Sequence, residues 1–221
     1  MKTASVRHLL AGAIALGAVA CSSAYYGTME TFGVHKRDIL VDRVTDARDD
    51  QEEAKKQFQT TLDAFREVTG WEPGRLGEAY EKLNDEYEDC EARADDVHAR
   101  IKSIEDVSGA LFKEWEEEDK TFTDPKLKAQ SQQMLKDTKD RYGELIGAMK
   151  KAEASMAPPL AAFHDQVTFL KHNLNAQAIA SLETQVGVIE TDVKKLVADM
   201  EASIAEADSF IKTLNTNAPK S

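Results

Sequence analysis

The sequence predicts an all-α protein, an elongated antiparallel four-helix bundle of long helices that pack with coiled-coil-like geometry. Apolar residues recur at seven-residue spacing along most of the chain. Only 5 prolines and 11 glycines occur in 221 residues, which is typical of long helices. The connections between the periodic segments are short, and short turns make neighbouring helices antiparallel. The alternative is two helical hairpins that pair in a homo-oligomer, and the sequence leaves both arrangements open.

The clearest periodic segment predicts a helix over residues 75–119. One column of the seam consists of Leu76, Leu83, Cys90, Val97, Ile104 and Leu111, and the other of Tyr80, Tyr87, Ala94, Ile101, Ser108 and Trp115. Most residues between these columns are charged, as on the solvent side of a packed helix. Cys90 lies within the seam, so we interpret it as a small buried apolar residue and not as a reactive thiol.

Three further helices complete a helical bundle over residues 28–215. The first covers residues 28–69 and is ended by the glycines and the proline of residues 70–74. The third covers residues 125–172, with Asp124 as its N-cap. Its seven-residue period continues across Pro158 and Pro159, which predicts one helix kinked at these prolines. The last covers residues 176–214, and residues 216–221 form a flexible tail.

The first 20 residues have the features of a secretory signal peptide. Lys2 and Arg7 supply its positive region, and residues 9–19 supply a short apolar core. This core is far shorter than the roughly 20 residues that a membrane-spanning helix needs. Small residues precede Cys21, as in a bacterial lipobox, so we expect lipidation of Cys21. The alternative is cleavage at the same bond by the ordinary signal peptidase, without lipidation.

Lipidation would attach the chain to a membrane through Cys21. Residues 21–27 are then the lipid anchor and a short tether, and Ser22 in place of an aspartate favours the outer membrane. The expected location is the periplasmic face of the outer membrane in a Gram-negative envelope. The formal net charge of −12 disfavours binding to nucleic acid, because an acidic surface repels the phosphate backbone.

Residues that would support catalysis, a cofactor or a bound metal are not grouped in the sequence. The histidines at positions 35, 98, 164 and 172 are scattered, with no pair at ligand spacing. The acidic residues from Glu114 to Glu118 favour a solvated face over a calcium site. We therefore expect no enzyme activity, no cofactor and no metal centre.

The turns far from Cys21 contain the candidate partner-binding residues. These are Trp71, Pro73, His172 and Asn173, which two turns would bring to the same end of the bundle. An exposed tryptophan is a frequent anchor for a protein partner. The alternative is that Trp71 folds back and closes the end of the bundle.

Four segments of the sequence resemble a family of proteobacterial lipoprotein-like proteins that is known only as a domain of unknown function. The segments are YYGTMETFGVHKRDILVDRV, DARDDQEEAKKQF, KLNDEYEDCEARAD and LFKEWEEE. Together with the lipobox, the resemblance extends from Cys21 to about Leu214. It implies a helical envelope protein of a Gram-negative bacterium, and it brings no catalytic or ligand-binding residues.

These observations predict a non-enzymatic, lipid-anchored envelope protein that acts as a structural scaffold or as a spacer that binds an envelope protein partner. The alternative is a helical lipoprotein that binds a small molecule or a cation. Its pocket would open at the kink at Pro158 and Pro159, close to Met149, Met156 and Phe163.

Overall fold

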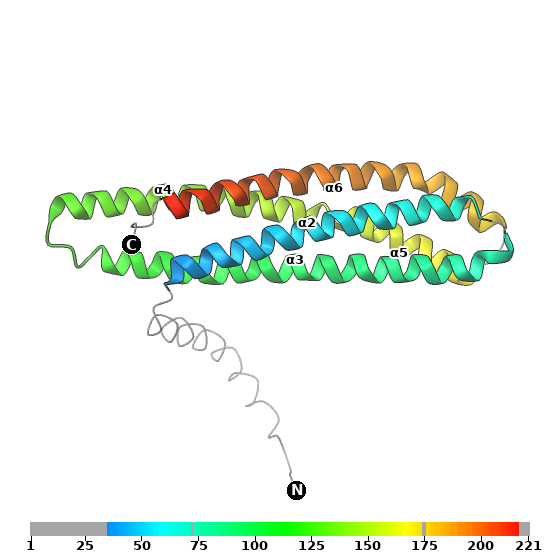
Figure 1. Ribbon diagram of the computed structural model, residues 1–221, viewed down its shortest axis with the longest axis horizontal. Coiled ribbons are helices and arrows are strands. Elements are labelled where there is room, and N and C mark those ends of the chain that lie inside the picture. The colour runs from blue at the N-terminus through cyan, green and yellow to red at the C-terminus, as the bar shows by residue number, and fades with distance from the viewer. Residues whose placement is uncertain (1–34, 72, 174–175, 217–221) are drawn as a thin grey trace, which may run out of the picture.

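The computed structural model describes residues 35–71, 73–173 and 176–216, and in these ranges all regular structure is helical. The helices are α2 (Lys36–Thr69), α3 (Leu76–Glu118), α4 (Pro125–Ala154), α5 (Ala157–His172) and α6 (Ala176–Thr216), with a short 3-10 turn, η1 (Pro73–Arg75), between α2 and α3. Helices α4 and α5 follow one another along the rod and form its third arm (Figure 1). The predicted signal peptide, Cys21 with its tether, and residues 28–34 of the first predicted helix lie outside the described residues.

Ion pairs between neighbouring helices establish that the arms are antiparallel. Along each pair of helices, the residue numbers rise on one helix while those of their partners fall on the other. The pairs are Lys36–Glu114, Arg100–Asp50 and Lys82–Glu67 between α2 and α3, Arg48–Asp208 and Arg66–Glu190 between α2 and α6, and Lys139–Glu116 and Lys150–Glu105 between α3 and α4. Between α4 and α6 the salt bridge Lys151–Asp199 and the hydrogen bond Arg141–Thr213 follow the same antiparallel order. One chain therefore completes the four-helix bundle. The predicted fold class is confirmed.

The core follows the seven-residue spacing. All six residues of the first predicted seam column of α3, from Leu76 to Leu111, are buried. In the second column, Tyr80 and Tyr87 are only partly buried and pack against the edge of the core. Since α3 has 43 residues, it spans about 65 Å at 1.5 Å per residue.

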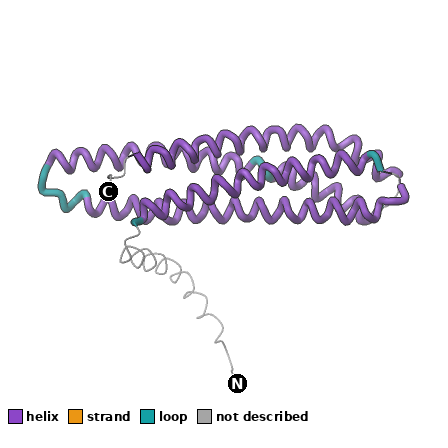
Figure 2. The backbone as a smooth tube through the Cα atoms, in the orientation of Figure 1, coloured by secondary structure: helices purple, strands orange, loops and turns teal. Residues whose placement is uncertain are grey.

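The third arm is interrupted at Ser155 and Met156, which separate α4 from α5 (Figure 2). The sequence analysis placed the kink at Pro158 and Pro159, a few residues later. Both prolines lie instead in the first turn of α5, where a backbone N–H has no helical partner and its absence costs little. Met156 is buried on the core side of the break, so the seven-residue period continues across it.

The α3–α4 hairpin extends beyond the other two arms. Lys36, the first residue of α2, bonds Glu114 of α3 at 2.9 Å, just before α3 ends. Figure 1 shows the turn between α3 and α4 projecting past the start of α2 and the end of α6. Asp124 caps α4 by accepting a hydrogen bond from the Lys126 backbone N–H at 2.8 Å, and Pro125 begins the helix. In the described part of the chain, this end of the rod is two helices thick.

Polar side chains interrupt the core at two levels. Gln51 of α2 is fully buried, and its Oε1 atom accepts a hydrogen bond from Ser203 of α6 at 2.9 Å. The Thr61 hydroxyl of α2 lies 3.1 Å from the Cys90 sulfur of α3. Burial raises the pKa of the Cys90 thiol to about 12.

We expect Cys90 to be inert toward thiol reagents in the folded protein. In a Cys21→Ser variant, reaction with a disulfide reagent at pH 8 should be slower in the native state than in urea by a factor on the order of a thousand, because only the thiolate reacts. The measurement is the absorbance of the released thiol over time. Equal rates in the two states would show that Cys90 is accessible.

Candidate functional site

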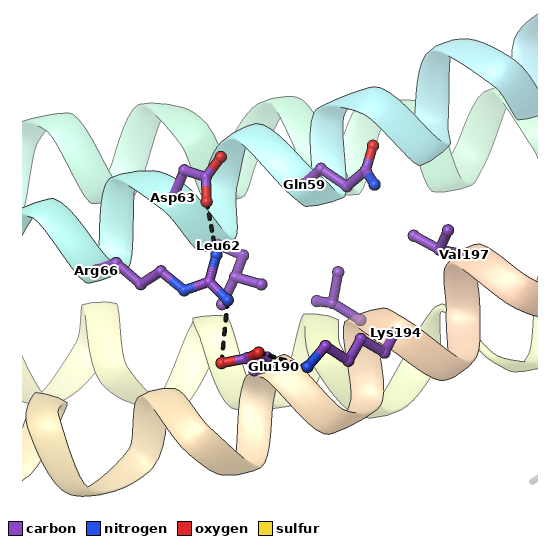
Figure 3. Close-up of a pocket in the computed structure, with 8 residues that line it drawn as sticks. Gln59, Leu62, Asp63, Arg66, Glu190, Lys194 and Val197 are labelled. Carbon is purple, nitrogen blue, oxygen red and sulfur yellow. Dashed lines mark hydrogen bonds and ion pairs between the residues drawn. The ribbon is translucent and has the colours of Figure 1, made fainter.

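A groove lies on the surface between α2 and α6. Its volume is about 390 Å³, and it is lined by Gln59, Leu62, Asp63, Arg66, Glu190, Val193, Lys194 and Val197. Figure 3 shows the α2 residues facing the α6 residues across the groove. Leu62 and Val193 are almost fully buried, so the floor is apolar while the rim is charged.

The charged groups on the rim neutralise one another. Arg66 bonds Asp63 at 2.7 Å and Glu190 at 3.0 Å, and Lys194 bonds Glu190 at 2.6 Å. Hydrogen bonds from Lys194 and Arg66 lower the pKa of Glu190, and the bond from Lys194 has the larger effect. Glu190 in turn raises the pKa of Arg66. All of these groups are exposed or partly exposed, so each pair contributes little to stability.

The side chains that line the groove are apolar, amide or charged. Histidine, cysteine and serine, which act as nucleophiles or as bases near neutral pH, are absent from its lining. The sequence analysis missed this groove because Arg66 and Glu190 are far apart in the chain, and nothing in one sequence pairs them.

The predicted distal residues lie at the two turns at the same end of the rod (Figure 1). Trp71 is partly buried and packs against the hydrophobic core. The Arg75 guanidinium lies 4.1 Å from the centre of the indole ring, within the range of a cation–π contact. This placement fits the alternative in which Trp71 closes the end of the bundle.

The other predicted distal residues differ in exposure. His172 is exposed at the end of α5. Asn173 caps that helix, because its Nδ2 atom donates to the Phe169 carbonyl at 2.9 Å and its backbone N–H donates to the Leu170 carbonyl at 3.1 Å. Pro73 begins η1. Among Trp71, His172 and Asn173, whose side chains the structure describes, His172 is the exposed one.

A comparison with protein families gives one result. The family described as "Protein of unknown function (DUF2959)" matches residues 25–214. The chain belongs to the DUF2959 family. No curated protein and no solved structure matches it. The predicted membership in an uncharacterised family is therefore confirmed, and the family itself assigns no activity and no site.

In this DUF2959 protein, the residues expected to line a pocket at the kink of the third arm lie in the core. Met149, Met156 and Phe163 are all buried. The Phe163 ring stacks on Phe65 with centroids 5.0 Å apart and lies 6.2 Å from Phe58. The groove that the structure does contain lies between α2 and α6, on other residues.

Two features of the described ranges concern metal binding and the membrane. In the part of the DUF2959 chain that the structure describes, no group of three or more His, Cys, Asp or Glu side chains is arranged to hold a metal ion. None of the described helices combines the length and the apolar character that crossing a bilayer requires.

Proposed function

We propose that this protein is a non-enzymatic, lipid-anchored protein of the Gram-negative envelope that acts as a structural scaffold or as a spacer between the membrane and a protein partner. Its location would be the periplasmic face of the outer membrane, with Cys21 as the lipidated residue. The observation that supports this function is the length of the bundle together with the position of its ends. The 34 residues of α2 span about 50 Å, so the end of α2 at Thr69 and the end of α5 at His172 lie far from Lys36, where α2 begins (Figure 1).

The packing of the rod supports a role that depends on shape. The core contains few polar residues and continues along all four arms, and ion pairs link α2 to both of its neighbours. A rod of this kind keeps its two ends at a fixed separation, which is what a spacer requires.

Crosslinking in cells tests the proposal. A photoreactive residue at His172, which is exposed at the distal end, is expected to capture a discrete envelope protein that a matched residue at exposed Val188 on the side of the rod does not capture. The products are identified by mass spectrometry. Crosslinks that join only two copies of this chain would indicate a homo-oligomer, and the absence of any partner from His172 would contradict the spacer function.

The α2–α6 groove supports a second candidate function, the binding of a small molecule. Its volume of about 390 Å³ lies within the usual range of about 300–1,000 Å³ for ligand sites. Native mass spectrometry of the isolated protein tests it. A retained ligand that is lost on substitution of Val193 by aspartate would favour this function over the spacer.

A further inference from the structure

The end of the α3–α4 hairpin carries an unusual group of exposed apolar side chains. We call this region, residues 119–134, the hairpin tip. It holds Phe122, Leu127 and Met134, which are 40%, 52% and 39% exposed. The other large apolar side chains exposed in the described ranges, Phe169 and Val188, lie singly on α5 and α6. The hairpin tip is therefore the place on the described surface where exposed apolar residues gather.

The hairpin tip is held in place by a polar network. The Trp115 indole N–H donates to the Ser131 hydroxyl at 2.8 Å, and that hydroxyl donates to Asp119. Asp119 is only 4% exposed. These bonds fix the start of α4 against the end of α3, so Phe122 and Leu127 are presented by an ordered turn.

The charge of the hairpin tip differs from that of the rest of the chain. Lys126 and Lys128 flank Leu127, and Lys120 precedes Phe122. The hairpin tip contains two acids: Asp124 caps α4, and the buried Asp119 accepts a hydrogen bond from Ser131. Its three lysines leave the tip with a formal net charge of +1. In the last turn of α3, Glu116 pairs with Lys139 and Glu117 with Lys120, and Glu118 is exposed. The whole chain, in contrast, has a formal net charge of −12.

Exposed aromatic and aliphatic side chains beside lysines form the pattern of a surface that enters the headgroup region of a bilayer. Lysines close to an anionic lipid surface are attracted to it. The acidic sides of the rod are repelled by the same lipid. Contact with lipid is therefore favoured at the hairpin tip and not along the sides. A rod that touches lipid only at its tip has its long axis directed away from the membrane.

We propose that the hairpin tip rests on an anionic lipid surface, with Phe122 and Leu127 in the headgroup region. This inference rests on the proposed anchorage at Cys21 and names a second membrane contact. The chain between Cys21 and His35 reaches at most about 50 Å when extended. The first ten residues of α4 project about 15 Å at 1.5 Å per residue, and they do so at the end of the rod where α2 begins (Figure 1). Anchor and tip can therefore meet one bilayer.

The test uses the full chain after processing in a Gram-negative host, reconstituted into vesicles that contain phosphatidylglycerol. An environment-sensitive fluorophore is attached at Thr123→Cys in the tip and, in a separate sample, at His172→Cys at the distal end. Quencher groups are placed on the lipid near the headgroup. Quenching of about twofold is expected at position 123, since interfacial residues enter about 5–10 Å into this region. No quenching is expected at position 172.

Matched variants separate the contribution of the apolar side chains to the lipid contact from that of the lysines. Replacing both Phe122 and Leu127 with serine should abolish quenching at position 123, whereas Val188→Ser removes an equally exposed apolar residue elsewhere and should leave it unchanged. Replacing Lys126 and Lys128 with glutamine should reduce quenching in phosphatidylglycerol vesicles and have little effect in phosphatidylcholine vesicles.

Flotation of the same vesicles distinguishes a failure of the anchorage at Cys21 from a failure of the lipid contact at the hairpin tip. Protein that does not float with lipid would contradict the anchorage at Cys21. Protein that floats but shows no quenching at position 123 would leave the anchor intact and overturn the tip contact. Protection of position 123 from aqueous quenchers without lipid quenching would also overturn it, because a protein surface would then cover the tip.

Discussion

Phe163→Ala is expected to lower the free energy of unfolding by about 3–5 kcal/mol, because it empties a fully buried aromatic site in a four-helix core. Phe163 of α5 has an exposed fraction of 0% and packs on Phe58 and Phe65 of α2, the arm diagonally opposite. The cavity would therefore remove the contact between α5 and α2, which meet only through the core. Urea unfolding followed by circular dichroism at 222 nm measures the change.

Phe169→Ala is the matched control for this substitution. Phe169 lies on the same helix and is 37% exposed, so its replacement should cost under about 1 kcal/mol, as surface substitutions usually do. Equal losses for the two variants would show that Phe163 is not a core residue and that the third arm packs in a different rotation.

Ser203→Ala is expected to lower the free energy of unfolding by about 1–3 kcal/mol, because it removes the partner of a buried amide. Gln51 Nε2 already has no hydrogen-bond partner among the described residues. Loss of the Ser203 hydroxyl, 2.9 Å from Gln51 Oε1, would leave both ends of that amide unpaired in the core. Ser209→Ala, at an exposed site on the same helix, controls for the higher helix propensity of alanine.

The double variant Gln51→Leu with Ser203→Ala is expected to recover at least the stability of the natural protein. It removes both polar groups and restores apolar packing, which is often neutral or favourable. Together with the Gln51→Leu single variant, the natural protein, Ser203→Ala and the double variant form a double-mutant cycle in which the interaction term measures the buried pair. A double variant less stable than Ser203→Ala alone would show that the Gln51 side chain contributes through packing and not through its hydrogen bond.

The parts of the fold that depend on local spacing could be predicted from the sequence. Leu83 and Val97 were assigned to the core of α3 by their seven-residue period, and both are buried. Asp124 and Pro125 begin α4 as the preference for a capping acid followed by proline predicts. The break in the third arm also follows from the chemistry of proline, once Pro158 and Pro159 are assigned to a first turn and not to a kink.

The parts that depend on how the arms are aligned could not be predicted. Seven-residue spacing does not say that Lys36 and Glu114 meet, because one sequence does not fix how far one helix is shifted along another. The projection of the hairpin tip follows from that alignment, as does the groove where Arg66 meets Glu190. Trp71 could close the bundle or remain exposed, and the choice depends on Arg75 lying over its ring.

The change from four helices to two along the rod has a mechanical consequence. A beam bends where its cross-section narrows, and in the described part of the chain that point lies at the level of Lys36 and Glu114. If the hairpin tip is held and a sideways force acts on the rod, the rod bends at this level and the four-helix section stays straight. Lys36 is buried at this level, and its salt bridge with Glu114 links α2 to α3 where the four-helix section gives way to the two-helix section.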